Sequence, residues 1–138
     1  MIVDVIEAVI AYLETKVEIT NLCSERIFGG GLPKDELDDM PRKCITLRYS
    51  GGAERYETMW TVRPRIDIRS YGETDNEASK IDRAVFTALH DMVRVTQGTT
   101  LLHSAGLAGG PVMMTDPANG WPFIFRAAII NAHGTEVE

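Results

Sequence analysis

Apolar residues recur at helical spacing in two stretches of the chain, and each stretch predicts an amphipathic helix. The first covers residues 2–15, and residues 16–22 continue it as a weaker turn or a second short helix. The second begins at Thr74-x-x-Glu77, a capping box in which each side chain satisfies a backbone N–H group. Its pattern runs to about residue 97, with Gly98 as the stop. The apolar stripes are Ile2, Val5, Ile6, Val9 and Leu13 in the first helix, and Ala78, Ile81, Val85, Leu89 and Met92 in the second.

Alternating apolar and polar residues predict strands in the rest of the chain. Residues 24–28 read as a short extended piece, residues 44–49 as a half-buried strand and residues 59–71 as a longer strand. Within the longer strand Pro64 cannot donate to a sheet, so we expect a bulge, an edge or a late strand start there. The last third predicts strands at 100–107, 112–114 and 121–132, with turns at 109–111 and 116–120.

The order of these elements indicates the fold class. Short turns between successive strands favour antiparallel pairing. We therefore predict one α+β domain over residues 1–138, with a single largely antiparallel sheet and two helices packed on one of its faces. The elements follow the order helix, two or three strands, helix, then two or three strands.

Charge is unevenly distributed along the chain. The composition, 44% hydrophobic and 25% charged, is that of a soluble globular protein, and no apolar run reaches the ~18 residues that span a membrane. Residues 1–40 carry nine acidic and three basic side chains, whereas residues 41–71 carry seven basic and three acidic ones, within a net charge of −6. A net acidic protein is poorly suited to grip nucleic acid. Separated signs allow the acidic patch of one copy to meet the basic patch of another, and scattered solvated charge is the alternative.

The residue types that carry catalysis form no recognisable motif. None of His90, His103 and His133 stands three or four residues from another, so the chain has no helix-borne metal pair. Ser104 lies in a sequence close to a nucleophile elbow, but the first glycine is missing and more strand follows where the elbow needs a helix. We predict no catalytic residue and a protein that is not an enzyme.

Binding motifs for metals, phosphates and cofactors are also missing. The triple glycine at 29–31 lacks the Lys-Ser/Thr of a phosphate loop and is interpreted as a flexible break in regular structure. The acidic cluster at 35–39 lacks the ligand order and central glycine of a calcium loop, so a solvated acidic loop is predicted. Cys23 and Cys44 have no metal-ligand spacing, and we expect two buried or half-buried thiols in a reducing compartment. We predict no metal and no cofactor.

Three groups of residues are candidates for contacts with other subunits or partner proteins. The strand at 121–125 is apolar at every position, so one of its faces can join the core. Its other face either meets a neighbouring subunit or is covered within the monomer. The candidates are an arginine row of Arg63, Arg65, Asp67 and Arg69, which suits an intersubunit salt-bridge face at least as well as an anion site; an acidic loop with Asp35, Glu36, Asp38 and Asp39; and the apolar residues Met113, Met114 and Trp121.

Several short motifs occur in a defined order along nearly the whole chain. They are an N-terminal helix, Arg26-Ile27-Phe28 before a Leu32-Pro33 loop, the strand at 44–49, the segment 65–72 before a capped helix, and the segment 115–122 before the closing strand. Their order and spacing resemble those of the tail-completion (tail-terminator) family of long-tailed bacteriophages.

The resemblance implies a structural virion protein that forms a ring, usually a hexamer. Such a ring caps the finished tail tube and joins it to the neck, so its partners are other copies of itself, the tail-tube protein and the head-completion (stopper) protein. DNA passes through its lumen without specific binding. The implied location is the virion, after synthesis in the host cytoplasm, with no membrane partner. The alternatives are a head–tail connector or neck ring and, less expected, a small enzyme or ligand-binding domain that uses His103 and Ser104.

Overall fold

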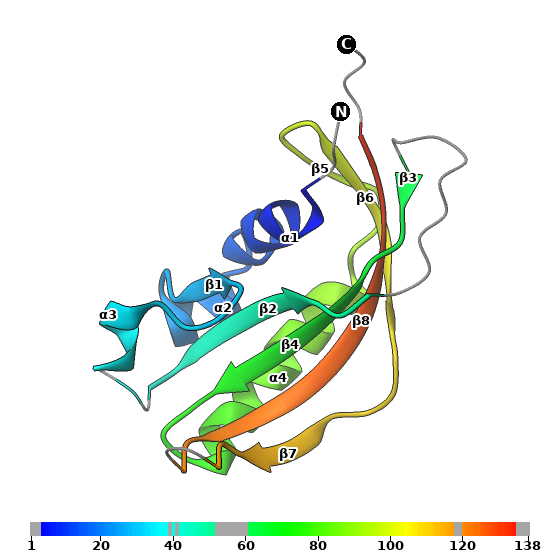
Figure 1. The fold of residues 1–138 in the computed structure, drawn as a ribbon. Helices are drawn as coiled ribbons and strands as arrows, with labels where there is room; N and C mark the ends of the chain where they lie inside the picture. Colours follow the sequence, from blue (N-terminus) through cyan, green and yellow to red (C-terminus); the bar gives the residue numbers. More distant parts are fainter. Residues whose placement is uncertain (1–3, 39, 41, 52–60, 118–119, 135–138) are drawn as a thin grey trace.

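A single curled sheet with the three longer helices packed against one of its faces forms the protein (Figure 1). The computed structural model describes residues 4–134 apart from 39, 41, 52–60 and 118–119. The prediction of an α+β fold with a largely antiparallel sheet is confirmed. The helices are α1 (Val5–Glu14), α2 (Val17–Cys23), α3 (Lys34–Leu37) and α4 (Asp75–His90). The strands are β1 (Ile27–Gly29), β2 (Cys44–Tyr49), β3 (Thr61–Val62), β4 (Arg65–Tyr71), β5 (Val95–Gln97), β6 (Thr100–Leu107), β7 (Val112–Thr115) and β8 (Pro122–Gly134).

The long strand β8 organises the sheet. Its main path runs β1-β2-β4-β8-β6-β5, with only the β1–β2 pair parallel. On one side β8 pairs with β4, and with β3 beyond it. On its other side β8 pairs with β7 through residues 122–125 and with β6 through residues 128–134. The 13 residues of β8 therefore form antiparallel pairs with strands on both sides of it.

The main core lies between the sheet and the helices α1, α2 and α4. Inward-facing strand residues such as Leu47, Ile68 and Ile130 pack against the apolar stripes predicted for the two long helices. Helix α1 contacts β1 and β2 at one edge of the sheet and β5 and β6 at the other, so the sheet curls around it. Asp4 caps α1 by accepting a hydrogen bond from the Glu7 backbone N–H at 3.0 Å.

The second long helix ends earlier than its sequence pattern indicates. Helix α4 stops at His90, and residues 95–97 form β5, a hairpin with β6, where a helix to residue 97 was predicted. The pattern is misleading because Met92 is buried in the same core as the helix stripe, although it lies beyond the helix. Gly98, with a φ of 62°, occupies the hairpin turn and is not the helix stop.

The strand predicted over residues 59–71 has one apolar and one polar face, as its alternating pattern indicates. Residues 59–60 lie outside the described residues, and the rest divides into β3 and β4 around Pro64, where an interruption was expected. The Pro64 carbonyl still accepts a hydrogen bond from the Ile130 N–H at 3.1 Å. Ile66 and Ile68 are buried on the helix side together with Ser70, and Arg65, Asp67 and Arg69 face away from it.

The segment between β1 and β2 covers one end of the opposite sheet face. It contains the short helix α3, where the sequence indicated only a loop. In the register of β2, β4 and β8, Cys44 lies beside Tyr71 and Tyr71 beside Phe123, and these three form a second small cluster. The half-buried residues that pack on it are Phe28, Leu32, Met40, Trp121 and Phe125. Phe123 on this face and Ile124 on the helix face are both buried, so the apolar start of β8 is covered on both faces within the chain at these two residues.

Candidate subunit-contact surfaces

The arginine row lies on the sheet face that the helices leave open. The side chains of Arg65, Asp67 and Arg69 are half-buried, and Arg63 is exposed between β3 and β4. The Arg65 Nε and Asp67 Oδ1 atoms lie 3.8 Å apart, both are buried, and neither makes a hydrogen bond within the described residues. The two atoms form a loose ion pair with each other, and because both are buried, a partner on this face meets the rest of the Arg65 side chain, which is 43% exposed.

Neighbouring strands extend this face. Arg48 of β2 is directly across from Asp67, and Phe125 of β8 is directly across from Arg69. The Arg69 guanidinium carbon lies 5.1 Å from the centre of the Phe123 ring, a cation–π contact that fixes Arg69 over the second cluster. The result is a mixed basic and apolar surface.

The acidic loop has a different arrangement from the solvated cluster predicted. Glu36 is buried, and its carboxylate accepts two hydrogen bonds from Arg42, from Nε at 2.5 Å and from Nη2 at 2.7 Å. These bonds lower the pKa of Glu36 below its usual value, against the opposing effect of desolvation. Asp35 and Asp38 are exposed, and Asp39 lies outside the described residues. Glu36 therefore holds the loop in place, and Asp35 and Asp38 are the acids that remain accessible.

Strand β7 is the most exposed apolar element among the described residues. Val112, Met113 and Met114 are 50%, 62% and 43% exposed, although apolar strand residues are usually buried. Trp121, the third apolar candidate, is half-buried against the second cluster. Of the three apolar candidates, Trp121 therefore packs within the chain, whereas Met113 and Met114 remain exposed.

The outer edge of β7 also has unpaired backbone groups. The strand pairs with β8 and with no other strand among the described residues. The Asp116 N–H donates to the Trp121 carbonyl at 2.9 Å, which makes Asp116–Trp121 a hydrogen-bonded pair of the hairpin. Hydrogen-bonded and non-hydrogen-bonded pairs alternate along an antiparallel ladder, so Met113 and Thr115 direct their N–H and C=O groups away from β8. Exposed edges of this kind are templates for another strand.

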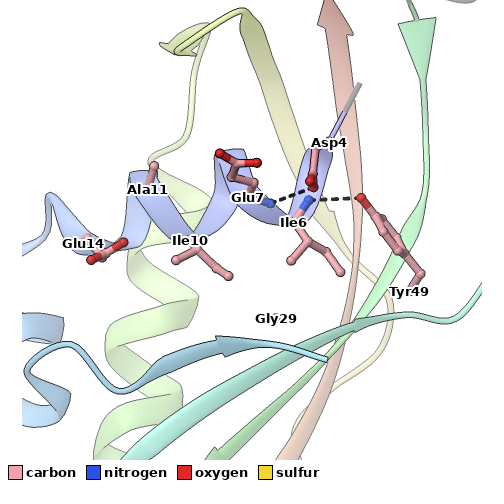
Figure 2. A pocket seen from close by; sticks show the side chains of 8 residues that line it. All are labelled: Asp4, Ile6, Glu7, Ile10, Ala11, Glu14, Gly29 and Tyr49. Carbon is pink, nitrogen blue, oxygen red and sulfur yellow. Dashed lines mark hydrogen bonds between the residues drawn. The ribbon is translucent and has the colours of Figure 1, made fainter. Parts of the chain in front are cut away.

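A second surface is an open groove between α1 and the edge strand β1 (Figure 2). The Tyr49 hydroxyl accepts hydrogen bonds from the Val5 and Ile6 N–H groups at 3.1 Å, which ties the start of α1 to the end of β2. A Cβ atom at Gly29 would lie 3.1 Å from Ile6 Cγ2, so the absence of a side chain lets helix and strand approach. The lining residues are apolar (Ile6, Ile10, Ala11, Gly29), acidic (Asp4, Glu7, Glu14) and Tyr49.

This groove was not predicted from the sequence. Its residues come from three segments that only the fold brings together, and the spacing of α1 alone indicates a buried stripe and a solvated face. The one available signal was the glycine at position 29, which was interpreted as part of a flexible break.

The residues considered for catalysis do not form an arrangement that activates a nucleophile. The Ser104 hydroxyl accepts a hydrogen bond from Asn131 Nδ2 at 2.9 Å. The rings of His103 and His133 lie 6.4 Å apart between centroids, on neighbouring strands. Within the described part of the chain, no three His, Cys, Asp or Glu side chains gather to hold a metal ion.

Both thiols are buried, as expected for unreactive cysteines. Burial raises the pKa of Cys23 to about 11 and that of Cys44 to about 12. The Cys44 thiol contacts the Met40 sulfur at 3.7 Å. The thiolate, which is the reactive form, is therefore scarce at neutral pH. No helix among the described residues is long and apolar enough to cross a membrane.

The fold has counterparts among solved structures. No family model and no curated protein matches the sequence. The chain is similar to a chain in the structure of the virion of a native gene transfer agent particle, with a TM-score of 0.63 and 12% identity over 94% of each chain. It is also similar to the bacteriophage SPP1 gp17 protein, with a TM-score of 0.49 and 18% identity over 90% of this chain and 85% of that one.

The two comparisons carry different weight. At 12% identity the first shows a shared fold over nearly the full length of both chains. The second is too distant in geometry to carry an argument.

Proposed function

We propose that the protein is a structural virion component that forms a homo-oligomeric ring, hexameric in the simplest case, at the end of a phage-type tail tube. The ring caps the tube, joins it to the head-completion protein of the neck and leaves a lumen for DNA. The observation that carries this proposal is the fold shared with a virion chain over 94% of both chains.

The surface supports a role in assembly. Three features on the described surface are open to a partner: the sheet face with the arginine row, the exposed strand β7 and the acidic groove beside α1. Exposed apolar patches rimmed by polar groups are typical of protein–protein contacts. None of the three resembles an enclosed pocket with convergent polar groups, the usual form of a small-molecule site.

The size and charge of the chain suit a conduit. A 138-residue domain has a radius of gyration of about 14 Å and hence a diameter of roughly 36 Å. Six such domains in a ring leave a central opening of about the same width, which is enough for a DNA duplex. A net charge of −6 disfavours retention of the passing DNA.

Light scattering on the purified chain, alone and mixed with tail-tube protein, tests the proposal. We expect a closed oligomer of defined size and tubes that stop growing when the chain is added. Pull-down against tail-tube and head-completion proteins separates a terminator from a connector or neck ring, which would not bind the tube. A strict monomer at every concentration, alone and with tail-tube protein, would refute the proposal.

A further inference from the structure

Strands β1 and β7 are the two free edges at the same end of the sheet. The pairing register runs without interruption from Ile27 through Ile45, Ser70 and Ile124 to Met113. This row crosses β1, β2, β4, β8 and β7, and at about 4.8 Å per step its ends lie roughly 19 Å apart. Figure 1 shows β1 and β7 on opposite sides of the domain. A partner bound at one edge therefore leaves the other free.

Each edge has backbone groups that the other can satisfy. The Gly30 N–H donates to Leu47 and the Ile45 N–H donates to Arg26, so residues 26 and 30 of the β1 segment turn toward β2. Because alternate residues of a strand point to opposite sides, Gly29 turns its N–H and C=O groups away from β2. By the same alternation, Met113 and Thr115 of β7 direct their N–H and C=O groups away from β8.

The side chains beside the two edges also match. The groove along β1 has an apolar wall of Ile6, Ile10 and Ala11, and Ile6 and Ile10 pack directly over Gly29 (Figure 2). Met113 of β7 is exposed and lies on the helix side of the sheet, in register with Ile124 and Ser70, and a methionine side chain fills irregular apolar spaces. The carboxylates on the groove rim can accept hydrogen bonds from donors on an incoming strand, and β7 offers unpaired N–H groups and the exposed Thr115.

We propose that β7 of one copy adds to the free edge of β1 in the next copy, with the Met113 side chain, which lies on the helix side of the sheet, in the groove beside α1. This inference rests on the proposed function, since it requires self-association. The contact joins two different surfaces, so it is heterologous, and repetition of such a contact about an axis closes a ring. It also covers an apolar edge strand that would otherwise be open to aggregation.

The test uses one variant for each surface. Met113→Asp places a charge on the exposed face of β7, and Ala11→Glu places one in the groove. We expect each variant alone to weaken self-association by at least about tenfold, as for a central interface residue. Val93→Asp is the matched control, because Val93 is 68% exposed and lies outside both surfaces, and it should assemble as the parent chain does.

Mixing the two variants gives the decisive result. The Met113→Asp copy keeps an intact groove and the Ala11→Glu copy keeps an intact β7, so the mixture should form one-to-one dimers and no ring. Should Ala11→Glu fail to fold, Glu7→Trp blocks the same groove through an exposed side chain.

Two outcomes would overturn the inference and leave the proposed function standing. One is normal ring formation by Met113→Asp. The other is a mixture that stays monomeric although the parent chain assembles and both variants fold. If Met113→Asp assembles normally but no longer binds tail-tube protein, β7 is the tube-binding surface and the inference is wrong. A parent chain that never assembles would refute the proposed function itself.

Discussion

The guanidinium of Arg126 donates two hydrogen bonds to the carboxylate of Asp82, from Nε to Oδ1 at 2.9 Å and from Nη2 to Oδ2 at 2.8 Å. Both side chains are buried, with 7% and 5% exposure, and the pair joins β8 to α4. The Arg126 guanidinium carbon also lies 4.9 Å from the centre of the Phe86 ring. Arg126 is in register with Ile68, so its side chain points toward the helices. The buried ion pair thus lies where the neighbouring residues make apolar contacts.

Removal of one member of this pair should destabilise the fold strongly. Asp82→Ala leaves the Arg126 charge buried without a partner, and we expect a loss of about 3–5 kcal/mol in the free energy of unfolding. Urea denaturation followed by circular dichroism measures it. The double variant Asp82→Leu with Arg126→Met removes both charges and should recover most of the loss. Equal stability of Asp82→Ala and the parent chain would contradict the assigned role of the pair.

Gly72 lies where β4 approaches the start of α4. A Cβ atom there would lie 2.7 Å from the Ala78 N atom and 2.8 Å from Glu77 Cβ. Gly72→Ala should therefore cost about 1–3 kcal/mol through overpacking. Gly110→Ala is the control, because no atom lies within 4 Å of its added Cβ, and it should leave the melting temperature nearly unchanged. Identical melting of the two variants would show that the strand and helix can separate without cost.

The Glu36–Arg42 pair should make stability depend on pH in the acid range. The pKa of Glu36 is lowered in the folded chain by the hydrogen bonds from Arg42. The stabilisation is therefore complete above the unfolded pKa of about 4.3, and it is lost as pH falls through the lower folded value. Melting temperatures measured from about pH 6 down to about pH 3 should fall less steeply for Glu36→Gln than for the parent chain. The control Asp35→Asn changes an exposed acid of the same helix, and an equal change in slope for both variants would contradict this account.

Periodicity predicted the elements whose burial alternates regularly. Ile66 and Ile68 face the core and Arg65 faces away from it, as the alternation indicated. The capping sequence at Thr74 placed the start of α4, where Thr74 accepts a hydrogen bond from the Glu77 N–H at 3.2 Å. In contrast to the predicted box, the Glu77 carboxylate bonds the Glu73 N–H at 3.0 Å. Local signals were sufficient here because they concern residues close together in the chain.

Features that depend on distant residues were not predictable in this way. Met92 continues the helix stripe in sequence and is buried, yet the chain has already left the helix, because core packing and not the period decides burial there. Glu36 was interpreted as solvated, and its burial depends on Arg42 reaching back across the loop. The exposure of Met113 follows from the position of β7 at a sheet edge, which is a property of topology.

The last prediction concerns the arginine row, which remains a candidate for subunit contact. Arg65→Glu places a second acid beside Asp67, at a position where Arg65 Nε and Asp67 Oδ1 now lie 3.8 Å apart. If an acidic surface of a neighbouring copy binds this face, reversal of the charge should weaken association by about tenfold, and added salt should reduce the difference. Arg69→Glu should act in the same direction and also loses the contact with the Phe123 ring.

Sedimentation velocity at low and high salt measures the effect of these reversals. Arg83→Glu is the matched control, because it makes the same change in net charge at an exposed position on α4. Thermal unfolding of each variant separates lost association from lost folding. A neighbour that binds the open sheet face loses a favourable charge at Arg65 or Arg69 and none at Arg83, which lies on α4. Unaltered ring stability in both Arg65→Glu and Arg69→Glu would show that the row is solvated and that subunits meet elsewhere.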